Sequence, residues 1–214
     1  MEITLLKADA FGRIELCREG EYRCIRRDTY AARRGLRWFA RWAGGREARV
    51  LAAIDEVPGL PQLLAWKDGV LLRSYLDGEP MQRAQPRDPA YFRAAHRLLR
   101  RLRACGIAHN DLAKEPNWLV LADGTPGIVD FQLAMRSRRR GRLFRLLARE
   151  DLRHLLKHKR TYCPQALTPT ERRVLARRSW ITRAWHASGK RAYKFIARRL
   201  FGYWDNEGAG RIRD

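Results

Sequence analysis

Alternating apolar and polar positions dominate the first third of the chain. Turn residues separate the alternating runs, including a polar turn at 18–21 and a turn at 67–69 that holds an Asp-Gly pair. A period of two residues between such turns is typical of antiparallel hairpins. The pattern therefore predicts a small β-sheet, with strands at residues 3–6, 13–17, 22–26, 62–66 and 70–75.

One helix is predicted within this first part, beginning at Arg46. Pro58-Gly59 is expected to end it, because proline cannot continue a helix and glycine favours its C-terminus. The apolar positions that recur at helical spacing are Val50, Leu51, Ile54 and Val57.

Helical periods dominate the rest of the chain. Asp88 is placed as an N-cap with Pro89 at the first helical position, and Gly106 is expected to end that helix. Residues 168–171, Thr-Pro-Thr-Glu, form a capping box that opens a helix running towards Ser188, and residues 190–203 form a basic amphipathic segment. We therefore expect an α+β protein with a small sheet part at 1–78 and a mainly helical part at 79–214.

Composition and charge narrow the class of protein. The 214 residues are 45% hydrophobic, which suits one compact domain or two packed lobes and excludes a disordered chain. The net charge is +22 and comes mostly from arginine, so anionic partners are expected, although a GC-rich genome enriches arginine without any function. No apolar run approaches the length of a membrane span.

The four cysteines form no C-x-x-C pair, so neither a zinc site nor a disulfide framework is indicated. The chain begins without a recognisable signal peptide. Both features favour a cytoplasmic protein, and peripheral contact with the inner face of a membrane is left open.

A predicted hairpin carries the candidate chemistry. Strands at 118–121 and 127–131 flank a turn at 122–126 that holds an Asp-Gly pair. Asn117 precedes the first strand and Asp130 lies near the end of the second, so the hairpin brings both to its open end. An amide oxygen and a carboxylate suit Mg²⁺, which completes its shell with water and phosphate oxygens. Asp111, just upstream, is placed to orient an acceptor hydroxyl.

These residues resemble the catalytic segments of protein kinases. His109-Asn110-Asp111-Leu112 with Asn117 is similar to the catalytic loop, and Val129-Asp130-Phe131 is similar to the metal-binding segment. The arrangement is most similar to the RIO-type kinases and to the Kdo/heptose lipopolysaccharide kinases. Residues 22–26 resemble the strand that carries the ATP lysine, and residues 72–78 resemble the hinge.

The resemblance implies a bilobal protein-kinase-like fold and a kinase that transfers the γ-phosphate of Mg·ATP to a hydroxyl. In that reading Asp111 is the catalytic base, and Lys114 neutralises the transferred phosphate. Asn117 and Asp130 hold Mg²⁺. The resemblance also assigns residues to the nucleotide site. An ion pair between Arg26 and Glu47 would position the phosphates, and the backbone around Ser74 and Leu76 would bind adenine.

Several positions depart from the kinase pattern. Arg26 stands where a lysine is usual, and only Gly12 remains of the glycine-rich loop. Asn117 follows Asp111 at one position more than in conventional protein kinases, and Gln132 replaces the glycine after Asp130-Phe131. No Ala-Pro-Glu segment follows, so the usual activation loop and peptide platform are not predicted.

The acceptor and two other function classes stay open. The acceptor is expected to be a protein serine or threonine or a lipopolysaccharide-type sugar, and basic residues at 136–145 and 190–204 favour an anionic one. A pseudokinase or basic module for membrane or RNA is the first alternative. A plain nucleic-acid-binding protein is the second, with only the aromatic and basic run Trp38–Trp42 in its favour. We interpret that run as a half-buried helix face.

Overall fold

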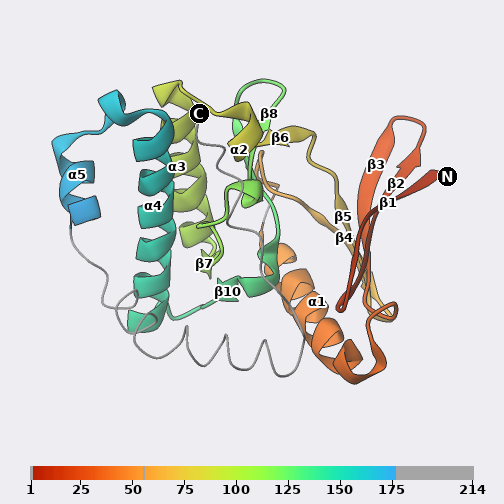
Figure 1. Ribbon diagram of the computed structural model, residues 1–214. Helices are drawn as coiled ribbons and strands as arrows, with labels where there is room; N and C mark the ends of the chain where they lie inside the picture. Colours follow the sequence, from red (N-terminus) through yellow and green to blue (C-terminus); the bar gives the residue numbers. More distant parts are fainter. Residues whose placement is uncertain (1, 55, 177–214) are drawn as a thin grey trace. The chain divides into compact units, whose positions relative to one another are not determined.

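The predicted sheet of the first third is present and consists of five antiparallel strands. The computed structural model describes residues 2–54 and 56–176. In spatial order the sheet runs β1-β2-β3-β5-β4 (Figure 1). Its strands are β1 (Glu2–Asp9), β2 (Gly12–Glu19), β3 (Tyr22–Asp28), β4 (Leu63–Lys67) and β5 (Val70–Ser74). All five match the predicted runs, with ends shifted by a few residues.

Gly12 closes the hairpin between β1 and β2 under a strict backbone constraint. Its φ is +130°, and a Cβ added there would lie 2.2 Å from the carbonyl oxygen of Asp28 on β3. A side chain at this position would therefore collide with the neighbouring strand. The glycine keeps the β1–β2 turn pressed against the end of β3.

The helix of the first part extends further towards the N-terminus than the sequence pattern predicted. Helix α1 spans Arg37–Leu51, after a short 3₁₀ turn η1 at Arg34–Leu36. Val50 and Leu51 are buried as predicted, but the helix begins at Arg37 rather than Arg46 and ends at Leu51. The predicted start was too far along the chain because the first turns of α1 carry aromatic residues that do not face the core, so the apolar pattern is visible only in the last turns.

The helical part is built around α3 and α4, which pack side by side (Figure 1). Helix α3 (Pro89–Ala104) has the predicted cap, since the Asp88 carboxylate accepts a hydrogen bond of 2.7 Å from Ala90 N. The elements between and around them are α2 (Met81–Ala84), β6 (Gly78–Pro80), β7 (Ile107–Ala108), β8 (Trp118–Leu121), β9 (Pro126–Ile128), β10 (Met135–Arg136) and α4 (Arg142–Tyr162).

One hydrophobic core joins the end of α1 to these elements. It takes Leu51 from α1, Leu99 and Leu102 from α3, Trp118 from β8 and Leu155 from α4. The apolar residues at helical spacing along α3 are all buried: Phe92, Ala95, Leu98, Leu99 and Leu102. The core thus fixes β8 and β9 against α3, and this packing positions the candidate site.

Three short 3₁₀ turns connect these elements, and one further helix ends the described part of the chain. The turns are η2 (Glu115–Asn117), η3 (Phe131–Leu133) and η4 (Pro164–Ala166), and the helix is α5 (Pro169–Ala176). The capping box is confirmed, because Glu171 N donates to Thr168 Oγ1 at 3.2 Å and Thr168 N donates to the Glu171 carboxylate at 2.8 Å. The predicted continuation of this helix to Ser188 and the basic segment 190–203 lie outside the described residues.

Two further features bear on the domain prediction and on membranes. The described residues up to Arg172 form one compact unit. The predicted division into 1–78 and 79–214 stays a prediction. None of the helices in the described part of the chain is long and apolar enough to cross a membrane.

Candidate active site

The hairpin of β8 and β9 delivers two of the predicted metal ligands to its open end. Trp118 pairs with Ile128, and the next hydrogen bond joins Val129 N to the carbonyl oxygen of Asn117 at 3.0 Å. At the other end Gly124 N donates to Leu121 O at 2.8 Å, which closes the predicted turn. The strand pairing therefore places Asn117 and Asp130 beside each other at the open end of the hairpin.

The loop before β8 gathers three predicted site residues. Lys114 Nζ lies 3.1 Å from Asp111 Oδ2, and Asn117 Nδ2 donates to the same oxygen at 3.1 Å. Asn117 Nδ2 also donates to the backbone oxygen of Asp111 at 2.9 Å. The Asp111 carboxylate is thus oriented by a cation and an amide, as general-base chemistry requires.

The electrostatics of Asp111 reflect burial first. Burial raises the pKa of its carboxyl, the ammonium of Lys114 and the amide of Asn117 lower it, and the charge of Asp130 raises it again. The net direction is upward, which makes Asp111 a better proton acceptor than an exposed aspartate. The influence of Asp130 also shows that the two carboxylates lie close enough to interact.

Two residues that the sequence did not single out for this role hold the loop in place. Asp151 on α4 accepts hydrogen bonds from His109 N at 2.7 Å and from Asn110 N at 2.9 Å. The buried His109 ring lies 3.0 Å from Val129 O through Nε2, and its Nδ1 accepts from Asp111 N at 3.4 Å. Burial lowers the pKa of His109 to about 4, so the ring is neutral and bridges the loop to the hairpin.

Asp130 adopts a left-handed backbone conformation at the edge of a pocket. Its φ is +67°. Its Oδ1 accepts a hydrogen bond of 2.9 Å from Gln132 Nε2 and lies 4.0 Å from Arg27 Nη2. Left-handed aspartates are uncommon and concentrate at functional sites. Gln132 stands where the protein-kinase pattern has glycine, and its side chain donates a hydrogen bond to the predicted metal ligand Asp130.

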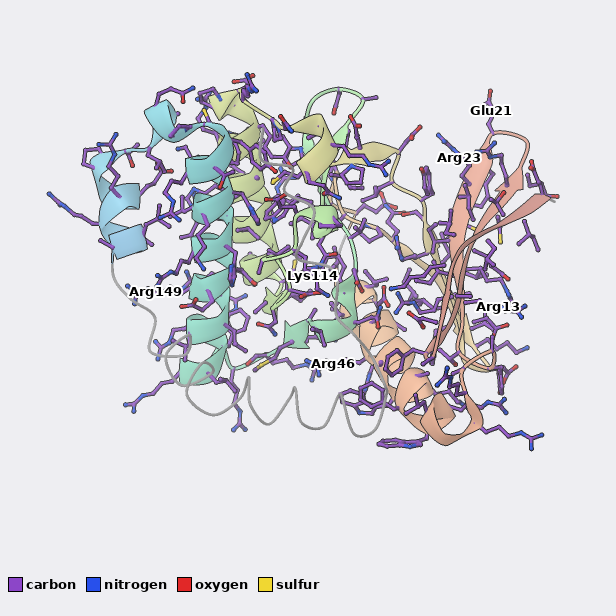
Figure 2. All side chains as sticks on the ribbon, in the orientation of Figure 1. Arg13, Glu21, Arg23, Arg46, Lys114 and Arg149 are labelled. Carbon is purple, nitrogen blue, oxygen red and sulfur yellow. The ribbon has the colours of Figure 1, made fainter. Side chains whose placement is uncertain are left out.

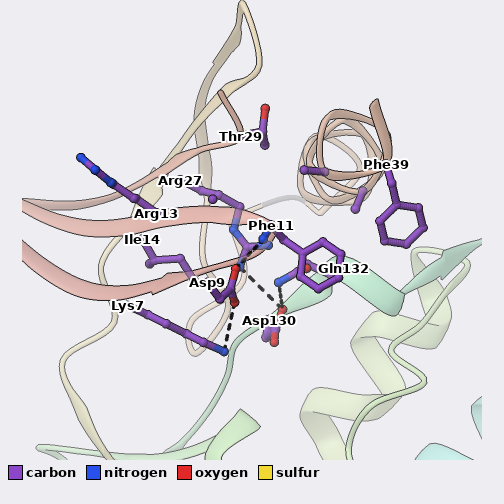
Figure 3. A pocket seen from close by; sticks show the side chains of 13 residues that line it. Lys7, Asp9, Phe11, Arg13, Ile14, Arg27, Thr29, Phe39, Asp130 and Gln132 are labelled. Carbon is purple, nitrogen blue, oxygen red and sulfur yellow. Dashed lines mark hydrogen bonds and ion pairs between the residues drawn. The ribbon is translucent and has the colours of Figure 1, made fainter. Parts of the chain in front are cut away.

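The pocket lies between the β1–β2 turn, α1 and Asp130 (Figure 3). Its volume of about 220 Å³ is below the ~300–1,000 Å³ of typical ligand clefts. Lys7, Arg13 and Arg27 supply three positive charges to its lining against the two carboxylates of Asp9 and Asp130, and Gly12 also lines it. A small cationic pocket closed by a tight turn suits phosphate groups rather than a whole nucleotide.

The predicted ion pair between Arg26 and Glu47 is wrong, and Arg27 takes its place. Arg27 Nη1 lies 3.2 Å from Glu47 Oε2, whereas Arg26 pairs with Glu15 at 2.6 Å and Asp28 at 3.1 Å. Side chains alternate along a strand, so Arg26 shares a face with Asp28 and stands opposite Glu15 on β2. Arg27 points to the other face, towards α1.

Glu47 is fully buried and shared by two arginines. Besides Arg27, Arg73 on β5 lies 3.8 Å from Glu47 Oε1 through its Nε. The exposed fraction of Glu47 is 0%, so its charge depends on these two partners. The sequence signal for Arg27 and Arg73 was their position on strand faces that carry buried Ile25 and Leu71, two residues away.

The segment after β5 leaves the backbone amide of Leu76 without a hydrogen bond among the described residues. Ser74 N donates to Gln62 O at 2.9 Å, and Tyr75 N donates to Arg23 O at 3.4 Å. Among the described residues, no hydrogen bond engages the N–H of Leu76. Of the two residues predicted to lie at adenine, Leu76 therefore has a donor to offer, whereas the backbone donor of Ser74 is already used.

Titration of Asp151 gives a test of the loop support. Burial raises the pKa of Asp151 from 3.8 to about 6, against the lowering effect of its two N–H donors. The folded state therefore binds this proton more tightly, so its contribution to stability is full below about pH 4 and is lost as pH rises through 6. Relative to Asp151→Asn, the free energy of unfolding of the wild type should fall by ~2–3 kcal/mol between pH 4 and pH 7.

Urea unfolding at a series of pH values measures this difference. Glu150→Gln is the matched control, because Glu150 is the neighbouring residue on α4, makes no hydrogen bond to the described loop residues His109 and Asn110, and is the smallest of the causes that set the pKa of Asp151. The difference between the wild type and that control should change much less with pH. A difference between the wild type and Asp151→Asn that stays constant or rises with pH would contradict the assignment.

Comparison with known proteins supports the fold. No protein-family model and no curated protein matches the sequence. Among solved structures, the chain is similar to the Rio2 kinase from Chaetomium thermophilum, with a TM-score of 0.59 and 16% sequence identity. The similarity covers 78% of this chain but only 60% of that kinase. The resemblance found in the catalytic segments is thereby confirmed at one level: the chain has a protein-kinase-like fold.

Proposed function

We propose that the protein is an ATP-dependent phosphotransferase that moves the γ-phosphate of Mg·ATP to a hydroxyl acceptor. The observation that carries the proposal is the joint approach of Lys114 and Asn117 to one oxygen of Asp111, each at 3.1 Å. In a protein-kinase-like fold, this carboxylate lies where an acceptor hydroxyl must be oriented.

Each residue of the loop has a distinct part in the proposed reaction. Asp111 orients the acceptor hydroxyl and takes its proton, which the raised pKa of its carboxyl favours. Lys114 balances the negative charge that develops on the transferred group. Asp151 and His109 keep the loop in position without contacting the substrate themselves.

The residues present fit Mg·ATP. Asn117 and Asp130 offer an amide oxygen and a carboxylate, which are hard ligands of the kind Mg²⁺ takes beside phosphate and water. Bound Mg·ATP supplies the phosphoryl group and neutralises part of its charge. Arg27 and Lys7 line the pocket that would receive the phosphates, and Leu76 offers its N–H to adenine.

The acceptor is the least constrained part of the proposal. Arginines are dense directly after the metal-binding segment, where a substrate would approach: Arg136, Arg138, Arg139, Arg140, Arg142 and Arg145. Guanidinium groups bind phosphate and carboxylate bidentately, which favours an anionic acceptor. A lipopolysaccharide-type sugar phosphate and an acidic protein segment with a serine or threonine both meet this requirement.

One observation favours the alternative of a pseudokinase or basic binding module. An arginine, Arg27, occupies the position on β3 that faces Glu47, and it also approaches Asp130 to 4.0 Å. The positive charge of Arg27 partly balances the negative charge of the Asp130 carboxylate, which would hold Mg²⁺. Nucleotide binding without transfer would identify this alternative.

The test is an assay of ATP turnover with and without Mg²⁺, followed by a screen of acceptors in protein, lipid and RNA fractions. Label from the γ-phosphate should appear in one fraction, and chelation of Mg²⁺ should remove it. Nucleotide binding without hydrolysis or transfer would favour the pseudokinase. Absence of nucleotide binding would overturn the proposal.

A further inference from the structure

A cluster of exposed aromatic side chains lies at the N-terminal end of α1. We call it the aromatic patch, and its members are Phe11, Tyr30, Trp38, Phe39 and Trp42. Their exposed fractions range from 38% for Phe39 to 71% for Trp38. The interpretation of residues 38–42 as a half-buried helix face holds for Phe39 and Trp42, which is 49% exposed, whereas Trp38 projects from α1 into solvent.

Phe39 joins three of the other rings of the aromatic patch, and Tyr30 is linked to α1 through Arg37 and Arg41. The Phe39 ring centroid lies 5.8 Å from Phe11, 5.9 Å from Trp38 and 5.6 Å from Trp42. These contacts join the β1–β2 turn to α1. Clustered exposed aromatics mark contact sites, because each ring would gain free energy by leaving water.

Arginine is dense on the α1 side of the aromatic patch, whereas Asp9 and Asp28 accept hydrogen bonds from the amides of Phe11 and Tyr30 at its strand side. Residues 30–46 contain no aspartate or glutamate, and their arginines are Arg33, Arg34, Arg37, Arg41 and Arg46. The guanidinium groups of Arg37 and Arg41 lie over the Tyr30 ring at 5.9 and 5.3 Å, and that of Arg46 lies over Trp42 at 5.5 Å. The surface therefore combines apolar rings with concentrated positive charge.

We propose that the aromatic patch binds the surface of a membrane that contains anionic phospholipid. Tryptophan and tyrosine rings favour the level of the lipid headgroups, where an apolar body and a polar edge are both satisfied. Arginines beside these rings bind the lipid phosphates, because a guanidinium group holds a phosphate bidentately. This site is independent of the proposed phosphotransferase activity.

The covered ring faces favour lipid over single-stranded nucleic acid. A base stacks on an aromatic side chain through an open ring face. Here arginines lie over the faces of Tyr30 and Trp42, and Phe39 contacts three other rings. Ring edges and guanidinium groups remain to meet a partner, and both suit an interface of headgroups and upper acyl chains.

The aromatic patch adjoins the candidate active site. Phe11 and Phe39 belong to the patch and also line the pocket beside Asp130. A membrane at the patch would therefore lie next to the pocket. Trp38 and Trp42 do not line the pocket, so they can be changed without altering it.

Vesicle cosedimentation of the full chain tests the proposal. The wild type should bind vesicles of phosphatidylcholine mixed with phosphatidylglycerol, bind neutral phosphatidylcholine vesicles much less, and be released by salt. Trp38→Ala/Trp42→Ala should weaken binding to the anionic vesicles by about tenfold or more, through loss of two interfacial rings. Far-UV circular dichroism and ATP turnover in solution should stay as in the wild type.

Two matched controls separate the patch from general charge and hydrophobicity. Tyr22→Ala removes an aromatic side chain that is 59% exposed at the start of β3, one residue after Glu21, which Figure 2 shows at the end of the sheet away from α1. Arg34→Glu/Arg41→Glu reverses two charges at the patch, and Arg18→Glu/Arg149→Glu reverses two charges on β2 and α4, where Figure 2 labels Arg149. Only the changes at the patch should reduce binding strongly.

Three results would overturn the proposal. The first is equal vesicle binding by the wild type and Trp38→Ala/Trp42→Ala. The second is equal binding to neutral and anionic vesicles at low salt. The third is binding of a short single-stranded RNA that depends on Trp38 and Trp42 while vesicle binding does not, which would identify nucleic acid as the partner.

Discussion

Replacement of Asp111 by asparagine is expected to reduce phosphate transfer by about 10²- to 10⁴-fold, the range that general-base catalysis contributes. The amide keeps the shape of the side chain and its place beside Lys114 and Asn117, but it cannot take a proton from the acceptor. Binding of Mg·ATP should change little, because Asp111 is assigned to the acceptor. Transfer is measured with labelled ATP, and nucleotide affinity by calorimetry.

Asp130→Asn should give the opposite distribution of effects. It removes the carboxylate assigned to Mg²⁺, so both nucleotide affinity and transfer should fall. Asp123→Asn serves as control for both variants, because Asp123 lies at the exposed turn of the same hairpin and only caps Thr125. Transfer at the wild-type rate in Asp111→Asn would contradict the proposed role of that residue.

Elements with local signals could be predicted from the sequence. The capping interactions of Asp88 and of Thr168 with Glu171 depend on residues within three positions, and the structure contains both. The same holds for the turn between β8 and β9. Because that hairpin places Asn117 and Asp130 by short-range pairing, the central part of the candidate site followed from the sequence as well.

Features set by distant contacts could not be predicted in this way. Asp151 supports the loop from α4, and nothing in its own segment distinguishes it from other acidic positions of an amphipathic helix. The start of α1 was missed because Trp38 and Trp42 face solvent, so the apolar period there does not follow the core. The face of β3 decided between Arg26 and Arg27, and the only local signal was the alternation with the apolar Ile25, two residues before Arg27 on the same face.

That register leads to a direct comparison of two neighbouring variants. Arg27→Ala leaves the fully buried Glu47 with Arg73 alone, at 3.8 Å. Breaking one partner from a buried ion pair costs ~3–5 kcal/mol, and the remaining arginine favours the lower end of that range. The free energy of unfolding should therefore fall by about 3 kcal/mol. Under conditions where the variant is still folded, its Michaelis constant for ATP should rise by about tenfold or more, because a pocket cation is lost.

Arg26→Ala is the matched control, since it removes the same side chain from the next position of the same strand. The Arg26 side chain is 30% exposed and pairs with Glu15 and Asp28 on the other face of the sheet. Partly exposed pairs of this kind contribute up to about 1 kcal/mol, and Arg26 does not line the pocket. Arg27→Lys should recover most of the stability, because an ammonium can still pair with Glu47. Urea unfolding and ATP kinetics on the three variants measure these effects. A larger rise of the Michaelis constant for ATP in Arg26→Ala than in Arg27→Ala would show that Arg26, rather than Arg27, contacts the phosphates.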